Sequence, residues 1–379
     1  MKILITGGAG FIGSHLARRL IKEGNIVTIL DNFSEQVHGD NKDLDEDLMS
    51  DSVLLIRGDI RDKSTVEEAI SDSEVIVHLA AETGTGQSMY EIEKYEATNV
   101  LGTLNIIQHL LSNKTAVRKI IIASSRAVYG EGAYSCSQHG VVYPDERDEK
   151  DMLKGVYDPR CPNCKEILLP CATKEIAPFK PLSYYALTKQ VQEQMVLMYA
   201  KILGIKGIAL RYQNVYGPGQ SLKNPYTGIM AIFSSLARKS EEIRIFEDGV
   251  ESRDFVYIDD VIDATYQAIV NDNIFVDSFN VGSGETTSVY NVASEIVSYF
   301  NSDSIVRNTG EFRVGDIRHN YADLTKSKEM LGYNPKWKFT EGLQIFLEWV
   351  ENQPIPNLGF EQSLKEMSEK GLFKKSESI

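Results

Sequence analysis

Tyr185 and Lys189 are the first side chains in this sequence whose types and spacing could carry out proton chemistry. They open a stretch, residues 183–203, that is predicted to be helical, and residues four apart project from one face of a helix. An ammonium group near a phenol favours the phenolate, which can remove a proton from an alcohol while hydride leaves for a nicotinamide ring. Tyr184 is not an equivalent candidate, because Thr188 rather than a lysine lies four residues on.

A serine segment makes this pair more informative, because Tyr–Lys pairs at this interval are common by chance. Ser124 and Ser125 follow a predicted strand, residues 119–123, whose end is expected beside a nicotinamide ring. A serine hydroxyl at that place can hydrogen-bond the reacting oxygen. The alternative is that both serines only cap an ordinary loop.

A glycine-rich turn, with Gly7, Gly10 and Gly13, lies between the apolar run 2–6 and the amphipathic stretch 11–22. Such a turn brings backbone amides close to a pyrophosphate and directs the positive end of a helix at it. The strand and the helix that this motif requires are both predicted here, so we expect a dinucleotide site. The alternative is a tight strand-to-helix turn without a ligand.

Two carboxylates follow later strands of the same region. Asp31 ends the apolar run 26–30 and follows Gly13 at close to the spacing of about 20 residues expected for the carboxylate that binds the adenosine ribose. A carboxylate there repels a 2′-phosphate, which favours NAD over NADP. Asp59 could hold the adenine amino group. Either aspartate could instead belong to a turn.

These side chains need a regular scaffold, and the first half of the chain alternates between two kinds of segment. The predicted strands are 2–6, 26–30, 53–57, 75–79, 119–123 and 205–211, and the predicted helices are 11–22, 64–70, 90–112 and 183–203. Such alternation predicts a parallel sheet with right-handed crossovers. The expected fold class is therefore α/β, a Rossmann-type doubly wound parallel sheet with a smaller C-terminal substrate-binding domain.

The length of 379 residues exceeds the usual limit of a single core, so more than one domain is expected. We predict an NAD-binding domain over residues 1–214, with an inserted segment at 131–181 that lacks clear periodicity. Residues 215–355 are expected to form mainly the substrate-binding domain, interleaved with the first. Residues 356–379 read as a polar tail that frays from Glu366 onward.

Composition narrows the possible partners. Hydrophobic residues make up 42% of the chain, charged residues make up 25%, and the net charge is −14. This charge argues against binding to nucleic acid or anionic lipid, and no apolar run approaches the length of a membrane span. The N-terminus does not resemble a signal peptide, and four cysteines do not make a disulfide scaffold, so a cytoplasmic protein is expected.

In combination, the motifs resemble the extended short-chain dehydrogenase/reductases, specifically the NAD-dependent nucleotide-sugar epimerase/dehydratase family. The resemblance covers residue 1 to about residue 350. It is carried by Thr6–Gly13, Asp59, His78-Leu79-Ala80-Ala81, Asn99-Val-Leu-Gly-Thr103, the Ser125 segment, Tyr185 with Lys189, Leu210-Arg-Tyr-Gln-Asn214 and Arg253-Asp254-Phe255.

The resemblance implies three catalytic residues, Ser125, Tyr185 and Lys189. The family's serine lies three residues before the valine of Val-Tyr-Gly, which selects Ser125 over Ser124. Asn99 is expected to help position Lys189 through water. The expected NAD-binding residues are Gly7, Gly10, Phe11, Ile12, Gly13, Asp31, Asn32, Asp59, Ile60, Leu79, Ala80, Ala81, Asn99, Tyr185 and Lys189.

The resemblance also implies a nucleotide-diphosphate sugar as substrate. Its expected binding residues are Ser125, Arg126, Asn214, Arg253 and Arg313, of which the last three resemble residues that hold the pyrophosphate. Positive charge concentrated in a cleft allows an acidic protein to bind two anionic dinucleotides. The alternative for Arg253 and Arg313 is ion pairing at the surface.

The expected reaction follows from the residues after Ser125. The family's 4,6-dehydratases typically have Asp-Glu at the positions that Arg126 and Ala127 occupy here, so dehydration is disfavoured. The resemblance implies an NAD-dependent nucleotide-sugar 4-epimerase of carbohydrate biosynthesis, and it is strongest to the enzymes that act on dTDP-L-rhamnose. The alternatives are a 4-epimerase of UDP-glucose or UDP-glucuronate, a 4-ketosugar reductase, and a non-catalytic NAD-binding scaffold or sensor. A homodimer through the helices at 90–112 and 183–203 is a family expectation.

The inserted segment contains every cysteine of the chain and makes the distance from Ser125 to Tyr185 more than twice that common in the family. Cys136 and His139 form one pair with a two-residue gap, and Cys161 and Cys164 form another. Zinc prefers four thiolate or imidazole ligands, and such a gap allows a tight turn to direct two ligands at one ion. We predict a structural Cys₃His zinc site, with Cys171 as a spare thiol or substitute ligand. The alternative is an unligated loop with four reduced cysteines.

Overall fold

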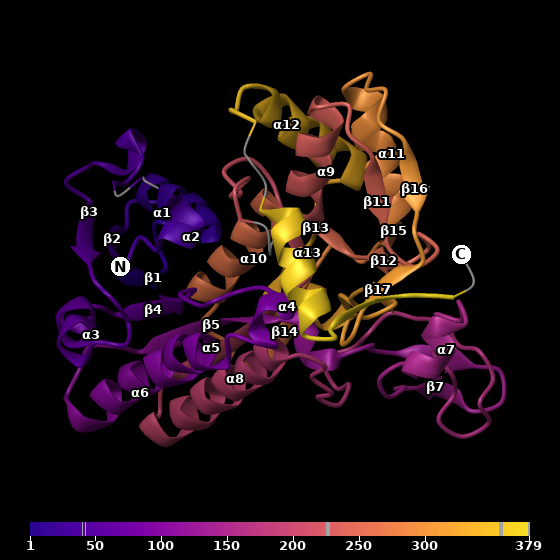
Figure 1. The fold of residues 1–379 in the computed structure, drawn as a ribbon. Helices are drawn as coiled ribbons and strands as arrows, with labels where there is room; N and C mark the ends of the chain where they lie inside the picture. The colour runs from indigo at the N-terminus through magenta and orange to yellow at the C-terminus, as the bar shows by residue number, and fades with distance from the viewer. Residues whose placement is uncertain (40, 42, 225–227, 356–358, 378–379) are drawn as a thin grey trace.

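A seven-stranded parallel sheet forms the centre of the structure, a computed structural model that describes residues 1–39, 41, 43–224, 228–355 and 359–377 (Figure 1). Its strand order is β14-β9-β5-β4-β1-β2-β3. The chain reverses its direction of winding between β1 and β4, and ligands of such sheets bind at the carboxyl ends of the strands there. The bounds are β1 Lys2–Thr6, β2 Ile26–Asp31, β3 Val53–Arg57, β4 Val75–His78, β5 Lys119–Ser125, β9 Lys206–Tyr212 and β14 Val276–Val281. The predicted α/β doubly wound sheet is confirmed.

Helices cover both faces of this sheet because its strands carry apolar side chains on both sides. In β1, Ile3 and Ile5 pack into one core and Leu4 into the other, as the two-residue period of a strand requires. One face is covered by α1 (Phe11–Lys22) and α10 (Ile258–Val270). The other is covered by α3 (Lys63–Ile70), α6 (Gly102–Ser112) and α8 (Tyr184–Leu203).

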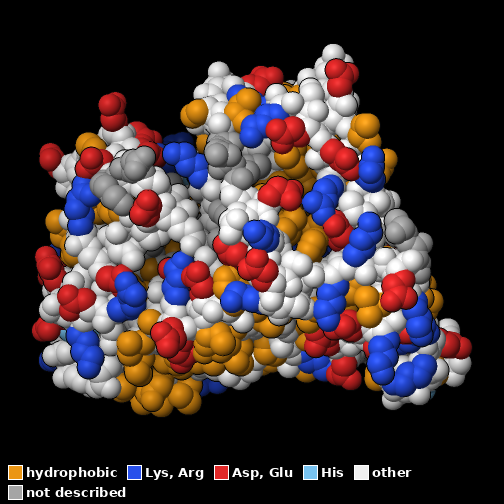
Figure 2. Space-filling model, in the orientation of Figure 1, with side chains coloured by type: hydrophobic (Ala, Val, Ile, Leu, Met, Phe, Trp, Pro, Cys, Tyr) orange, Lys and Arg blue, Asp and Glu red, His pale blue; other side chains and the backbone are white. Residues whose placement is uncertain are grey.

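The helix that carries Tyr185 has clear signals at both ends. The Ser183 side chain accepts a hydrogen bond from the Ala186 amide and caps the start of α8. Gly204 ends the helix with φ +69°, the left-handed conformation that glycine adopts without strain. The outward faces of α6 and α8 leave hydrophobic side chains exposed, which gather at the foot of the view in Figure 2.

The predicted helix at 90–112 is three helical segments in succession. They are α5 (Ile92–Tyr95), a π-helical segment η2 (Glu96–Leu101) and α6. A π turn often marks a place where a side chain must be directed at a site. Asn99, which lies in this turn, is fully buried.

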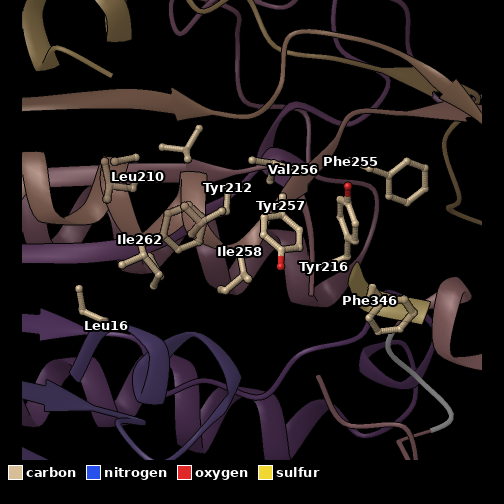
Figure 3. Close-up of a cluster of buried hydrophobic side chains, with 14 of the residues drawn as sticks. Leu16, Leu210, Tyr212, Tyr216, Phe255, Val256, Tyr257, Ile258, Ile262 and Phe346 are labelled. Carbon is tan, nitrogen blue, oxygen red and sulfur yellow. The ribbon is translucent and has the colours of Figure 1, made fainter. Parts of the chain in front are cut away.

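The C-terminal half builds a second layer over the carboxyl edge of the sheet. Its helices are α9 (Ile229–Arg238), α11 (Val289–Tyr299) and α12 (Phe339–Glu351). Its small sheets are β10-β13 (Asn214–Tyr216, Phe255–Tyr257), β11-β16 (Ile243–Ile245, Val306–Asn308) and β15-β12-β18 (Thr287–Ser288, Ser252–Arg253, His319–Asn320). The two halves of the chain are interleaved in space. Strand β14 and helix α10 come from the C-terminal half, but they belong to the central sheet and to its helical cover. Figure 3 shows part of the shared core, where Leu210 and Tyr212 of β9 lie beside Ile258 and Ile262 of α10.

The inserted segment has a small sheet of its own, β7-β6-β8 (Gly140–Val142, Tyr134–Cys136, Leu169–Pro170), and one short helix, α7 (Glu149–Leu153). All pairings in this sheet are antiparallel. The remaining short elements are α2 (Glu35–His38), η1 (Glu46–Leu48), α4 (Thr85–Ser88), η3 (Arg126–Tyr129) and η4 (Ser327–Leu331). Across the described part of the chain, every helix is too short or too polar to span a bilayer.

The prediction of a fraying C-terminal tail is wrong for most of its length. Residues 356–358 and 378–379 lie outside the described residues, but Phe360–Glu369 forms helix α13 and Phe373–Lys375 forms strand β19. This strand pairs antiparallel with β17 (Glu311–Arg313). The segment is ordered because α13 is amphipathic and buries Leu364 and Met367 on one side.

Candidate functional site

A cavity of about 630 Å³ lies at the carboxyl ends of the central strands. Its volume is within the range of ligand sites, and such sites form at this edge of a doubly wound sheet. Among the predicted NAD- and substrate-binding residues, only Asn99 does not line it. The lining includes Gly7, Gly10, Phe11, Ile12, Gly13, Asp31, Asn32, Asp59, Ile60, Leu79, Ala80, Ala81, Ser125, Arg126, Tyr185, Lys189, Asn214, Arg253 and Arg313.

The glycine turn at the floor of the cavity tolerates no side chain at two of its positions. Gly7 has φ +69°, and a Cβ there would lie 2.8 Å from the Ala80 amide nitrogen. A Cβ on Gly13 would collide with the carbonyl oxygen of Gly7. The close approach of backbone at the start of α1 leaves room for an anion to reach the helix N-terminus. This cradle fits the pyrophosphate of NAD.

Asp31 is buried at the end of β2 and braces the glycine turn. Its Oδ2 accepts a hydrogen bond from the Ala9 amide at 3.0 Å, and its Oδ1 accepts one from the Phe33 amide at 2.9 Å. Asp59 accepts hydrogen bonds from the side chains of Asn32, at 2.8 Å, and Arg61. Burial would raise the pKa of Asp59, but the hydrogen bonds from Arg61 and Asn32 lower it overall.

Tyr185 and Ser125, two of the predicted catalytic residues, lie together in the cavity. The Ser125 hydroxyl hydrogen-bonds the Tyr185 phenol, and Ser125 ends β5 while Tyr185 lies in the first turn of α8. The expected lowering of the Tyr185 pKa is wrong for this structure. Burial raises the pKa of Tyr185, and the Ser125 hydrogen bond and the Arg126 charge oppose that rise only in part.

Lys189 is buried one helical turn beyond Tyr185. Its Nζ donates to the Ala123 carbonyl oxygen of β5 at 2.9 Å. Burial lowers the pKa of Lys189 to about 7. The ammonium group therefore titrates in the neutral range, so a charged group bound beside it can change its protonation.

Asn99, which does not line the cavity, contacts α8 through hydrogen bonds. Its Nδ2 donates to Thr188 Oγ1 at 3.0 Å, and its Oδ1 accepts from the Glu82 amide at 2.8 Å. It contacts Thr188, the residue next to Lys189, directly. The expected link from Asn99 to Lys189 through water stays a prediction. Gln192 adds a second link, because its amide donates to Thr103 Oγ1 at 2.8 Å.

The opposite part of the cavity is basic. Arg313 pairs with Asp316 at 2.8 Å, and Arg253 pairs with the same carboxylate at 3.3 Å. Burial opposes ionisation of Asp316, but Arg313, Arg253 and Arg126 together hold its pKa below the usual range. The predicted alternative of surface ion pairing does not describe Arg253, which is 7% exposed and lines the cavity.

Arg126 is the cation of this group that has no hydrogen-bond or ion-pair partner among the described residues. Burial, and then the charge of Arg253, lower the pKa of Arg126 to about 10. Asn214 also has an unused group, since its Oδ1 is buried without a hydrogen-bond partner in the described chain. Polar groups held in this state are typical of a site that a ligand completes.

Several cavity residues were missed by the sequence reasoning. Asp316 organises the arginines, and Phe360, Ser363 and Met367 of α13 form part of the lining. A signal for the helix was present, because Phe360, Leu364 and Met367 follow a helical i, i+4, i+7 spacing. No local sequence pattern predicts that α13 packs over the cavity.

The four predicted metal ligands come together outside this cavity. The ligand atoms of Cys136, His139, Cys161 and Cys164 all lie within 4.8 Å of one another. Cys171 is not part of this group, so its predicted role as a substitute ligand is not supported by its position.

Comparisons with known proteins agree with the family resemblance. A model of the NAD-dependent epimerase/dehydratase family matches residues 3–150 and 161–282. The chain is 37% identical to a dTDP-L-rhamnose 4-epimerase of Burkholderia thailandensis over 354 residues, which covers 93% of this chain and 95% of that protein.

Solved structures resemble it over a similar length. One is a UDP-glucose 4-epimerase of Thermotoga maritima with UDP-glucose, which has a TM-score of 0.73 and 30% identity and covers 93% of this chain and 99% of that one. Another is a UDP-glucuronic acid 4-epimerase of Bacillus cereus in complex with UDP-glucuronic acid and NAD, with a TM-score of 0.73, 26% identity and coverage of 93% and 99%.

Proposed function

The chain belongs to the NAD-dependent epimerase/dehydratase family, and we propose that it is a nucleotide-sugar 4-epimerase. The observation that carries this proposal is that one cavity is lined by the glycine turn, by Tyr185 with Ser125, and by the arginine group. A dinucleotide cofactor, a sugar hydroxyl and a diphosphate can therefore be bound in one continuous space.

The glycine turn and Asp31 would hold NAD, whose nicotinamide ring supplies a reversible acceptor for the C4 hydride when it is bound. Tyr185 removes the proton of the C4 hydroxyl, and Ser125 hydrogen-bonds the same oxygen while it becomes a ketone. The transient 4-keto sugar turns its other face, and Tyr185 returns the proton as the hydride is restored. No net oxidation results.

Lys189 favours this proton transfer electrostatically. Its pKa of about 7 means that both the ammonium and the neutral amine are accessible near neutral pH. When the ammonium is present, its charge favours the Tyr185 phenolate and opposes the effect of burial on the tyrosine.

The arginine group would bind the substrate diphosphate. Arg126, Arg253 and Arg313 bring three positive charges to a place where Asp316 supplies one negative charge. Guanidinium groups bind phosphate oxygens through charge-assisted hydrogen bonds, and two of these arginines are already held in place by Asp316. The unpaired Asn214 Oδ1 can accept from a hydroxyl or amide of the same ligand.

dTDP-L-rhamnose is the first substrate to test, because the Burkholderia relative that is 37% identical to this chain is named as a dTDP-L-rhamnose 4-epimerase. UDP-glucose and UDP-glucuronate are the alternatives. The purified protein is incubated with a panel of dTDP- and UDP-sugars without added cofactor, and the products are identified by NMR. The proposal predicts multiple turnovers to a C4 epimer.

The same experiment separates the competing functions. A 4-ketosugar reductase would stop after at most one equivalent, because it consumes its reduced cofactor. An NAD-binding scaffold or sensor would convert nothing. If no sugar is epimerised at C4, the proposed function is wrong.

We also propose a homodimer through α6 and α8. Hydrophobic side chains are exposed along the outward faces of η2, α6 and α8, where a continuous patch on a monomer is typical of an interface (Figure 2). They are Leu101, Leu104, Leu111, Leu187, Met198 and Ile202. Light scattering should give the mass of a dimer, and Met198→Glu with Ile202→Glu should give that of a monomer.

A further inference from the structure

We propose that the inserted segment binds one structural zinc ion through Cys136, His139, Cys161 and Cys164, and that this ion braces the substrate-diphosphate end of the cavity. Zinc has no part in the proposed hydride chemistry, because none of the four ligands lines the cavity. The bracing role, unlike the metal site itself, rests on the proposed function.

Three of the separations between ligand atoms match those of a zinc tetrahedron, and all of them lie within 4.8 Å. Cys136 Sγ lies 3.4 Å from His139 Nδ1 and 3.6 Å from Cys164 Sγ, and Cys161 Sγ lies 3.6 Å from His139 Nδ1. Zinc bonds of about 2.0 Å to nitrogen and about 2.3 Å to sulfur place neighbouring ligand atoms roughly 3.5–3.8 Å apart. A sulfur separation of 3.6 Å is too long for a disulfide.

Two tight turns present these ligands to each other. Cys136 ends β6 and His139 lies just before β7, and Cys136 faces Gly140 across the hairpin. In the second turn, the Cys161 carbonyl accepts from the Lys165 amide at 3.0 Å, and the Cys161 amide donates to Glu166 at 2.8 Å. The pairs thus occupy two knuckle-like turns rather than one extended loop.

Glu166 joins the two turns directly. Its carboxylate accepts from Ser137 Oγ at 3.1 Å and from Gln138 Nε2 at 2.9 Å, and both donors lie between Cys136 and His139 in the chain. This link holds the turns in the same register that the four ligand atoms require. The donor set of three thiols and one imidazole is the chemistry of a closed structural zinc site.

Around the proposed ligands, the inserted segment has only a small hydrophobic core. Its sheet buries a cluster of only a few residues among the described part of the chain, and three of the proposed ligands belong to that cluster. The members are Tyr134, Cys136, Val142, Cys161, Leu168 and the partly buried Cys164. A core of this size stabilises the two turns weakly, and a metal crosslink would add to their stability.

The segment in turn contacts the loop at residues 314–318, which contains Asp316 and hydrogen-bonds Arg253. Glu131 Oε2 accepts from the Arg318 amide at 2.9 Å, and the buried Arg147 donates to the Asp316 carbonyl at 2.8 Å. The carbonyl of Arg318 accepts from Arg253 Nη1 at 2.9 Å. Tyr134, at the start of β6, hydrogen-bonds Glu131 at 3.1 Å and connects this network to the metal turns.

Metal analysis of protein purified without chelator tests the site. We expect about one zinc per chain, and the double variant Cys161→Ser/Cys164→Ser should lose it. Cys171→Ser is the matched control, because Cys171 lies outside the cluster and its variant should retain the metal. Protein grown with zinc that contains none, or that contains iron instead, would overturn the proposal.

Thiol titration and cobalt give readouts that do not need a folded variant. In native wild-type protein, the three ligand thiols should react slowly and Cys171 should react first, and a chelator should release the other three. Cobalt(II) added to metal-free protein should give the thiolate charge-transfer and intense d–d absorption of a tetrahedral site. Four equally reactive thiols before chelation, or no such spectrum, would contradict the site.

Calorimetry with dTDP and with NAD tests the bracing role. Metal-free protein should bind dTDP at least about tenfold more weakly, which corresponds to about 1.4 kcal/mol, and should bind NAD as before. Unchanged dTDP binding with zinc present in the wild type would refute the brace alone. Failure of the epimerase assay leaves the zinc content unaffected, so the two proposals fail separately.

Discussion

The Ser124 hydroxyl is bound to Glu193, with its Oγ 2.5 Å from Glu193 Oε2. The same carboxylate pairs with Arg211, and both side chains are buried. The Ser124 hydroxyl is therefore used to stabilise the buried Glu193–Arg211 ion pair. Ser125, in contrast, hydrogen-bonds Tyr185 in the cavity. This difference gives a structural reason for assigning the catalytic role to the second serine.

Replacing the two serines should separate these roles. Ser125→Ala should lower kcat by about a hundredfold, because it removes a hydrogen bond to the reacting oxygen. It should lower the free energy of unfolding by only about 1 kcal/mol, since the Ser125 hydroxyl also caps η3 by accepting from the Ala127 amide at 3.2 Å. Ser124→Ala should keep most of the activity and lower the free energy of unfolding by about 1–3 kcal/mol, since it removes a buried hydrogen bond to a charged group. Denaturant unfolding and steady-state kinetics measure both. The reverse pattern would assign catalysis to Ser124.

Tyr185→Phe should bind NAD normally and lower turnover by at least about a hundredfold, because proton transfer then has no acid or base. Tyr184→Phe is the matched control. The Tyr184 hydroxyl bonds Glu96 outside the cavity, and its loss should leave kcat close to that of the wild type. Retained activity in Tyr185→Phe would remove the assigned base.

The stability of the cofactor-stripped protein should depend on pH through Lys189. Its folded pKa of about 7 lies below the ordinary value of 10.5, so the unfolded chain binds more protons between these values. This group's contribution to stability is complete above pH 10.5 and is lost as pH falls toward 7.

Unfolding of the wild type and of Lys189→Met at several pH values tests this relation. The wild type should gain stability relative to the variant from about pH 7 to about pH 9, by on the order of 2 kcal/mol. A difference that does not change with pH would show that Lys189 is charged in the folded protein throughout.

Arg126→Met should weaken the binding of dTDP by about tenfold or more, since a charge-assisted hydrogen bond contributes about 1.5–3 kcal/mol. It should not lower stability, because the guanidinium has no ion-pair partner among the described residues and its burial opposes its charge. Arg307→Met, whose guanidinium pairs with Glu242 at the surface, is the control. Calorimetry that shows equal dTDP affinity for wild type and Arg126→Met would exclude a diphosphate contact.

Met367→Ala should raise KM for the nucleotide sugar and affect kcat less. Met367 lines the cavity from α13, and its sulfur lies against Gly86, so truncation would open this side of the site to water. Lys365→Ala on the same helix is the control, since Lys365 is exposed and does not line the cavity. If Met367→Ala leaves KM unchanged, α13 is a structural cover and has no role in binding.

The features that the sequence determined are those that depend on residues close together in the chain. The glycine turn follows from a strand, three glycines and a helix in succession, and the placement of Tyr185 and Lys189 follows from the helical period. The two Cys/His pairs of the proposed metal site are equally local, because each pair has a two-residue gap that a single turn can close. The doubly wound parallel class of the sheet follows from the alternation of strands and helices, whereas the order of its strands is known only from the structure.

Tertiary structure decided what depends on packing between distant segments. Asp316 pairs with both Arg253 and Arg313, and α13 folds over the cavity. Cys171 lies apart from the cluster of the other three cysteines and His139. These relations involve parts of the chain that no local pattern connects. The pKa of Tyr185 belongs to the same class. Its sequence neighbour at i+4 predicts a lowered value, but the pKa is set by desolvation, and how deeply a side chain is buried is decided only when the whole fold closes around it.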